Sequence, residues 1–378
     1  MYGIMVKKVS IFLCLLCFLS QSFGSAQPAP APAPELQWLT TPHPKLEING
    51  LPWYTANKGE WIRLPLSLKE VVREPVWKLA QSPSGARLRF RSNTGSLSIR
   101  LEYPQPPGMR NMHAFGQSGV DLYVDGVYHG TATADAEAKP GKVYTHSFFS
   151  GRPRQEREIT LYLPLYLGVK VLAIGLDPDA GLQRPRPFAR EKPVVFYGTS
   201  ITQGGCASRS GMSYQAILGR MLNLDYVNLG FSGNGRGEPE MARAVAEIEA
   251  SCFVMDFAQN NPTLESLQEV YDPFLSAVRS RHPDTPILLI TPIYAAREAW
   301  GPDERLEGMR AHIRQVGARR IAAGDARLQI VEGTDLLGPA DGSGLVDGVH
   351  PNDLGFQRMA ERLAARLGKV LRLEGTDR

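Results

Sequence analysis

Ser200, Asp347 and His350 are the residues of this chain that could together perform covalent catalysis. A serine hydroxyl supplies a nucleophile, an imidazole supplies a base, and a carboxylate orients that imidazole. His350 alone among the seven histidines has a carboxylate three residues earlier. This spacing lets Asp347 bond one ring nitrogen and leaves the other for Ser200, as serine ester hydrolysis requires. Because Pro351 also suits a helix start, a capping role for this segment is the alternative.

Ester hydrolysis also needs hydrogen-bond donors for the negative charge that develops on the carbonyl oxygen. Ser200, Gly233 and Asn260 follow three successive apolar runs of the sequence. We expect the backbone N–H groups of Ser200 and Gly233 and the side-chain amide of Asn260 to form this oxyanion hole. Asn261 directly follows Asn260 and competes with it for the role.

The elements that must position these residues alternate between short apolar runs and amphipathic segments. This pattern predicts a parallel sheet covered by helices on both faces, with the site at the carboxyl ends of the strands. The expected strands are Val194–Tyr197, Tyr226–Leu229, Cys252–Phe257, Ile287–Ile290 and Leu328–Val331. The expected helices are Ser213–Leu222, Glu240–Ala250, Leu264–Arg281, Pro302–Ala323 and Asp353–Leu371.

The preceding part of the chain reads as β-structure. Runs of alternating polarity, such as Ala86–Arg91, Leu97–Glu102 and Glu158–Leu163, are separated by turn residues, and Val124-Asp-Gly-Val127 indicates a hairpin. No long helical pattern appears here. We therefore predict a β-sandwich domain over residues 37–182, a connector rich in proline and charge, and an α/β domain over residues 190–372.

The first residues predict export. Lys7 and Lys8 precede a short apolar core, and Gly24-Ser-Ala26 has the small residues of a cleavage site. Residues 1–26 therefore read as a signal peptide, with an uncleaved anchor as the alternative. The Ala- and Pro-rich residues 27–36 predict a semi-rigid tether. We expect a periplasmic or extracellular protein in which Cys206 and Cys252, at opposite ends of their strands, stay free and buried.

Composition excludes several other classes. The 378 residues carry a formal charge of +4, and loss of the leader would leave +2, which is too little for a nucleic-acid or anionic-membrane partner. We also expect no stable membrane insertion. No histidine or cysteine pair has the spacing of a zinc site, and the serine mechanism needs no cofactor or metal.

Four blocks of the sequence, those around Ser200, Gly233, Asn260 and His350, resemble in this order the SGNH (GDSL) hydrolase superfamily. Its signature Ser, Gly, Asn and His correspond to Ser200, Gly233, Asn260 and His350, and its Asp three residues before the histidine corresponds to Asp347. The resemblance implies a flavodoxin-like parallel sheet flanked by helices and an esterase that uses a Ser-His-Asp triad.

The resemblance extends into the β region. Gly119-Val-Asp-Leu-Tyr123 is similar to the Gly-x-Asp-Leu-Tyr signature of an N-terminal domain that accompanies one SGNH subgroup. The sequence departs from the family at Thr199, where many members have Asp, and at Asn261, where many have Asp after the block asparagine. These departures are compatible with the hydrolase class, but they weaken any inference about the substrate.

We expect the substrate to be a carbohydrate with small acyl esters, most simply acetyl esters. Export, an appended β domain and the absence of a long apolar lid favour this reading. The aromatic rings at the start of the β domain suit sugars or an ordinary core (Trp38, Trp53, Trp61 and Trp77). A lipid esterase, lysophospholipase or thioesterase with the same site is the first alternative, and a non-catalytic carbohydrate-binding protein is the second.

Four further residues are candidates for contact with the substrate. Arg209 and Arg236 follow the first two blocks and could bind an acid or sugar hydroxyls, although surface solvation explains both. Asn261 could face the same cleft. Asp121 could help build the cleft if the β domain packs over it, or it could stabilise a turn.

Overall fold

Five short apolar runs form one parallel sheet in the computed structural model, which describes residues 35–373. The strand order is β12-β11-β13-β14-β15, the flavodoxin-like order that we predicted. In such a sheet, ligands bind at the carboxyl ends of the strands beside the point where the order reverses, here next to β11. The strands are β11 (Val194–Gly198), β12 (Tyr226–Gly230), β13 (Cys252–Asp256), β14 (Ile287–Ile290) and β15 (Leu328–Val331).

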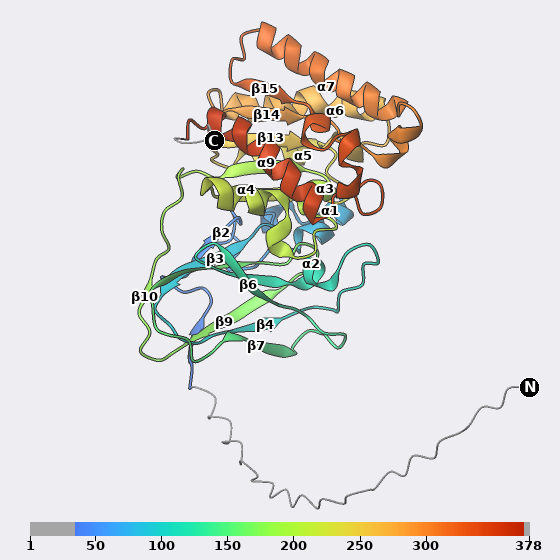
Figure 1. Cartoon of the computed structure of the whole chain (residues 1–378). Coiled ribbons are helices and arrows are strands. Elements are labelled where there is room, and N and C mark those ends of the chain that lie inside the picture. Colours follow the sequence, from blue (N-terminus) through green and yellow to red (C-terminus); the bar gives the residue numbers. More distant parts are fainter. Residues whose placement is uncertain (1–34, 374–378) are drawn as a thin grey trace, which may run out of the picture. The chain divides into compact units, whose positions relative to one another are not determined.

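Helices cover both faces of this sheet (Figure 1). Because successive side chains of a strand point to opposite faces, Val194 and Phe196 pack on one side, and Val195 and Tyr197 pack on the other. The first side carries α4 (Tyr214–Leu222) and α9 (Asp353–Val370), and the second carries α5 (Pro239–Ala246), α6 (Leu264–Arg281) and α7 (Glu304–Ala322). Shorter turns complete the layer: α3 (Ser200–Gln203), α8 (Gly333–Leu336), η2 (Ser210–Met212), η3 (Ala258–Asn260), η4 (Ala296–Trp300) and η5 (Pro339–Gly344).

The amino-terminal part is the predicted β-sandwich, with its own apolar core between two antiparallel sheets. One sheet contains β1 (Gln37–Thr40), β9 (Lys170–Leu176), β4 (Leu97–Glu102) and β7 (Val143–Phe149). The other contains β10 (Leu182–Gln183), β3 (Arg87–Ser92), β8 (Arg157–Tyr162), β5 (Val120–Val124) and β6 (Val127–Ala132), with β2 (Glu47–Asn49) paired to β3.

Short helices interrupt this domain where sequence periodicity gave no signal: η1 (Leu66–Leu68), α1 (Glu74–Ala80) and α2 (Ala114–Ser118). In the α/β domain, α5 ends at Ala246, four residues before the predicted end, because the chain then turns into β13. The predicted signal peptide and residues 27–34 of the predicted tether lie outside the described residues.

Buried arginines of the β domain connect it to the α/β domain. Arg63 is fully buried, and its guanidinium donates to the backbone carbonyls of Asn228 and Gly230 in β12 as well as to two carbonyls of its own domain. Arg87 is also buried and pairs with Asp225, just before β12. These contacts tie the β domain to the strand that leads to Gly233, and both domains belong to one compact unit.

The cysteines and the helices of the described residues bear on two further expectations from the sequence. Cys206 and Cys252 are both free and buried, as predicted. Within residues 35–373, no helix combines the length and apolarity that crossing a membrane requires.

We expect Arg63→Ala to lower the free energy of unfolding by about 3 kcal/mol or more, because truncation leaves several buried carbonyl groups without donors. Urea denaturation of the full chain measures this loss. The exposed Arg281 provides a control whose replacement by alanine should cost no more than about 0.5 kcal/mol. An equal, small loss for both variants would contradict a bridging role for Arg63.

Candidate active site

A tight turn at the end of β11 presents Ser200 as the first residue of α3. The hydroxyl of Thr199 accepts from the N–H of Ile201 at 3.2 Å, and the hydroxyl of Thr202 accepts from the N–H of Thr199 at 3.2 Å. A Cβ atom on Gly198 would lie 2.0 Å from Thr202 Oγ1, so this position must be glycine. The threonines thus cap the helix from both sides and fix the backbone of Ser200.

The structure brings Ser200 together with His350 and Asp347, which lie on the loop before α9. Ser200 Oγ is 2.9 Å from His350 Nε2, and His350 Nδ1 is 2.8 Å from Asp347 Oδ2. The other oxygen of Asp347 accepts the backbone N–H groups of His350 at 2.9 Å and Val349 at 3.1 Å. The carboxylate therefore holds the imidazole and its own loop at the same time.

The predicted oxyanion donors lie beside Ser200. Ser200, Gly233 and Asn260 line one pocket of about 340 Å³, which His350 also lines. Among residues 35–373, the backbone N–H groups of Ser200 and Gly233 have no hydrogen-bond acceptor. One amide hydrogen of Asn260 bonds the carbonyl of Phe231 at 2.9 Å, which leaves the second hydrogen for a ligand.

The loop that carries Gly233 is held from two sides. Gly233 has a φ of +67°, a conformation that favours glycine. The Arg236 guanidinium donates to the Gly233 carbonyl at 3.1 Å, so this arginine supports the loop and does not line the pocket. Arg73 of the β domain donates to the side chain and the backbone carbonyl of Asn234, at 2.8 and 2.9 Å.

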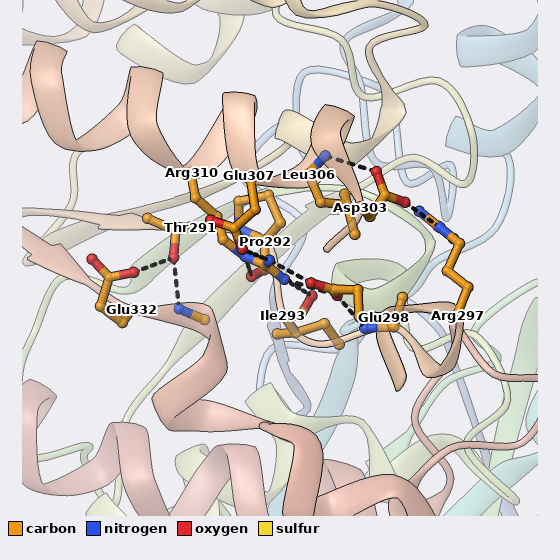
Figure 2. Close-up of polar contacts among 12 residues, drawn as sticks. Thr291, Pro292, Ile293, Arg297, Glu298, Asp303, Leu306, Glu307, Arg310 and Glu332 are labelled. Atoms are coloured by element: carbon orange, nitrogen blue, oxygen red, sulfur yellow. Dashed lines mark hydrogen bonds and ion pairs between the residues drawn. The ribbon is translucent and has the colours of Figure 1, made fainter. Parts of the chain in front are cut away.

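The opposite wall of the pocket is the segment after β14, which contributes Ile293, Tyr294, Ala295 and Arg297. Arg310 of α7 is buried beneath it and donates to the carbonyl of Ile293 at 2.9 Å (Figure 2). The same guanidinium bonds both carboxylate oxygens of Glu298, at 2.6 and 3.0 Å. A fork of two parallel bonds is the strongest arrangement for such a pair, so this wall is rigid.

Asn261 lies elsewhere. Its side chain is 2% exposed and points to the carbonyls of Phe257 and Ala258 in its own turn, and it does not line the pocket. Asn260 is therefore the member of this pair that lines the pocket. Sequence alone could not separate the two because they are adjacent and chemically identical.

Arg209 and Asp121 also lie outside the pocket, where they bind one another at 3.0 Å. Asp121 is fully buried and accepts the N–H of Gly211 at 2.7 Å and the hydroxyl of Thr131 at 2.6 Å. Arg209 also bonds the hydroxyl of Tyr123 at 2.6 Å. The Asp-Leu-Tyr part of the signature thus binds the loop that follows Ser200, and neither Asp121 nor Arg209 lines the pocket.

Three contacts around the triad were not predicted. The Tyr166 hydroxyl donates to the backbone carbonyl of Ser200 at 3.3 Å, and Asn111 donates to Asp347 at 3.2 Å. Below the turn, Asp256 accepts from the hydroxyl of Thr202 at 3.1 Å. Tyr166 and Asn111 belong to the β domain, and no local pattern in the sequence links them to residues so far away.

The electrostatics keep the Asp347 carboxylate ionised. Partial burial alone would raise its pKa, but hydrogen bonds from His350 and Asn111 hold the pKa well below its usual range.

Cys206 Sγ, an Asp347 oxygen and a His350 nitrogen lie within 4.8 Å of one another, which is close enough to consider a metal. Burial and the charge of Asp347 raise the pKa of the Cys206 thiol to about 11, so this group is protonated at neutral pH.

Comparisons with known proteins identify a family for each of the two domains. Residues 36–182 match the model described as the N-terminus of Esterase_SGNH_hydro-type, and residues 191–368 match the GDSL-like Lipase/Acylhydrolase family. A structure described as a GDSL-like lipase from Bacteroides ovatus has a TM-score of 0.79 and 29% sequence identity, over 89% of this chain and 98% of that chain.

Two further structures share the fold at lower identity. Salicylyl-acyltransferase SsfX3 from a tetracycline biosynthetic pathway has a TM-score of 0.75 and 21% identity, over 90% of this chain and 99% of that chain. A family two carbohydrate esterase from Clostridium thermocellum was solved with cellohexaose. It has a TM-score of 0.57 and 20% identity, over 76% of this chain and 93% of that chain. No protein of curated function matches the chain in sequence.

The sheet order, the site and these matches define a carboxylic ester hydrolase. Residues 191–368 form a domain of the GDSL-like lipase/acylhydrolase family, and residues 36–182 form the Gly-x-Asp-Leu-Tyr amino-terminal domain of SGNH-type esterases.

We expect Asp256→Asn to stabilise the protein above neutral pH. Burial raises the pKa of Asp256 to about 7, against the opposing hydrogen bond from Thr202. The folded state therefore binds this proton more tightly than the unfolded chain, and the native protein loses stability as pH rises from about 4 to about 7. The asparagine side chain does not ionise, so the variant avoids this loss in the free energy of unfolding, which amounts to at most about 4 kcal/mol.

Urea denaturation of both proteins at about pH 4 and about pH 8 measures the effect. The variant should gain stability relative to the native chain between the two values. A difference that stays constant with pH would contradict a neutral Asp256 in the folded protein.

Proposed function

We propose that this hydrolase is an exported serine esterase that removes small acyl groups, acetyl foremost, from carbohydrate. The observation that carries the proposal is the continuous chain of contacts from Ser200 Oγ through the His350 ring to Asp347, at 2.9 and 2.8 Å, on the wall of a pocket that also holds three donors. Export rests on the signal peptide predicted from the sequence.

The mechanism follows from these positions. Ser200 Oγ attacks the ester carbonyl while His350 Nε2 takes its proton, and Asp347 stabilises the imidazolium that forms. Next, His350 gives the proton to the leaving alcohol, and a serine ester remains. Water then attacks this ester with His350 again acting as base, which releases the acid and restores Ser200.

The oxyanion of each tetrahedral intermediate would lie among the N–H groups of Ser200 and Gly233 and the amide of Asn260. Each such donor contributes typically about 3–4 kcal/mol of transition-state stabilisation. The donors are fixed before the reaction, because the capped turn holds Ser200 and the Phe231 carbonyl holds Asn260. The mechanism requires no metal or cofactor.

The pocket favours a small acyl group. Its volume of about 340 Å³ is at the lower end for ligand pockets, and its walls include polar side chains such as Arg297 and Arg305. A long acyl chain would need an extended apolar groove, whereas the apolar side chains here, such as Ile293, Leu306 and Val349, enclose only this small volume. These features support acetyl over fatty acyl esters.

The four tryptophans near the start of the β domain, for which the sequence offered sugar contact or an ordinary core, pack within the protein. Trp61 is buried, Trp53 and Trp77 pack against the α/β core, and Trp38 stacks under Arg100 at 3.8 Å. Trp300, in contrast, is 96% exposed at the end of η4.

Trp300 is on the same short helix as a residue of the pocket wall. It follows Arg297, which lines the pocket, by three residues, a rise of about 6 Å in a 3₁₀-helix. Residue Ala296 of the same turn donates its N–H to the carbonyl of Gly348 in the triad loop at 2.7 Å. We propose that the Trp300 ring stacks on a sugar attached to the ester. The cellohexaose in the structure of the carbohydrate esterase that shares this fold is consistent with such a substrate.

Replacement of Ser200 by alanine tests the mechanism. We expect Ser200→Ala to abolish the hydrolysis of nitrophenyl acetate and acetate release from acetylated glycans, because it removes the hydroxyl that forms the acyl-enzyme. The melting temperature should stay nearly unchanged, since the hydroxyl is at the edge of the pocket. Activity that survives this change would show that the site is elsewhere.

The same assays distinguish the alternatives. A carbohydrate acetylesterase should hydrolyse acetyl esters faster than butyryl and longer esters. A preference for long acyl chains would indicate a lipid esterase, and a preference for thioesters would indicate a thioesterase. Binding of glycan without any turnover would indicate the non-catalytic alternative.

We expect Trp300→Ala to raise KM for acetylated oligosaccharides about fivefold, because an aromatic contact contributes about 1 kcal/mol. The kinetics with nitrophenyl acetate, which has no sugar, should not change. Trp300→Phe should keep most of the glycan affinity. Met221→Ala, which removes another exposed apolar side chain from α4, provides the matched control. An unchanged KM in the Trp300→Ala protein would exclude the stacking role.

A further inference from the structure

A residue of the β domain contacts the carboxylate of the triad directly. Asn111 Nδ2 lies 3.2 Å from Asp347 Oδ2, the same oxygen that bonds His350 Nδ1. The other donors to Asp347 among the described residues come from its own loop, namely the N–H groups of Val349 and His350. Asn111 is thus the one donor that reaches this carboxylate from a different domain.

The loop that carries Asn111 is built to hold it in place. Gln117 of α2 is 4% exposed, and its amide oxygen accepts the N–H groups of Gly108 and Met109, at 2.9 and 2.8 Å. Its amide nitrogen donates to the carbonyls of Met109 at 3.0 Å and Met112 at 2.6 Å. One buried side chain therefore fixes the backbone on both sides of Asn111.

The same loop is anchored to the α/β domain. Met112 is buried in the apolar cluster that contains Ile201 of the nucleophile turn. Beyond α2, the carbonyl of Gly119 accepts the hydroxyl of Ser210 at 2.6 Å. The loop with Asn111 is thus held against the segment that follows the nucleophile, and a shift of one domain against the other would move Asn111 away from Asp347.

We propose that Asn111 is a positioning residue of the esterase, through which the β domain completes the triad. Asp347 has a side-chain exposure of 34%, so water competes for its oxygens. Asn111 is itself exposed, but Gln117 holds its loop, so its amide donor on Oδ2 favours the carboxylate orientation that faces His350 Nδ1. Asn111 does not line the pocket, so it acts on the reaction step and not on substrate binding. The inference rests on the proposed function.

A second asparagine at the domain boundary offers a matched control. Asn49 Nδ2 lies 3.5 Å from Asp225 Oδ2, so this pair joins the same two residue types across the same two domains. Asp225 precedes β12 at the amino end of the sheet, far from the triad at the carboxyl end. If the Asn111 contact served only to join the domains, loss of either asparagine would have similar consequences.

The experiment compares the full chain with its Asn111→Ala, Asn111→Asp and Asn49→Ala variants in the hydrolysis of nitrophenyl acetate. We expect Asn111→Ala to lower kcat about tenfold, with KM within about twofold and the melting temperature nearly unchanged. Asn49→Ala should keep the native kcat. Asn111→Asp should shift the acid limb of the pH–rate profile to higher pH, because a second carboxylate beside Asp347 favours the protonated imidazole.

A native kcat and pH profile in both Asn111 variants would overturn the proposal. Parallel losses of kcat and melting temperature in Asn111→Ala and Asn49→Ala would also overturn it, in favour of simple domain adhesion. The rate at which a fluorophosphonate labels Ser200 provides a readout that needs no known substrate, and Asn111→Ala should slow it about tenfold. If the native chain hydrolyses no ester and takes no label, the proposed function itself fails, and this inference fails with it.

Discussion

The structure of this site depends on one contact, the hydrogen bond between the hydroxyl of Ser200 and the imidazole of His350. The two residues are 150 positions apart and lie on separate loops at the carboxyl edge of one sheet. Each loop is fixed locally, the first by the capping of α3 and the second by the bonds that Asp347 makes to its own backbone. The wall held by Arg310 joins the second loop through Ala296 and Gly348.

The β domain takes part in this arrangement instead of being a separate appendage. Arg63 and Arg73 hold β12 and the loop that carries Gly233. Asp121 binds the loop after the nucleophile, and Asn111 reaches the triad carboxylate. Buried charges with complete hydrogen bonding are costly to separate, so these contacts favour a single relative position of the two domains. This explains in physical terms why Asp121 of the signature is charged and yet buried.

The sequence predicted the elements well where local chemistry determines them. Helix α6 has the predicted bounds, because Thr263 caps its start and its apolar positions repeat at helical spacing. The apolar runs predicted the strands of the parallel sheet, and the spacing of three residues predicted the contact between Asp347 and His350. The contacts that the sequence did not predict are tertiary contacts. The burial of Asp121, its pairing with Arg209 and the approach of Asn111 depend on how two domains pack, which no local pattern encodes.

The most direct test of the account is a crystal structure of the protein after reaction with a small organophosphonate that mimics the tetrahedral intermediate. The account predicts a covalent bond to Ser200 Oγ, with the phosphonyl oxygen at hydrogen-bond distance from the N–H groups of Ser200 and Gly233 and the amide of Asn260, and His350 still bonded to Asp347. A phosphonate attached to another residue, or an oxygen that points away from these donors, would contradict it.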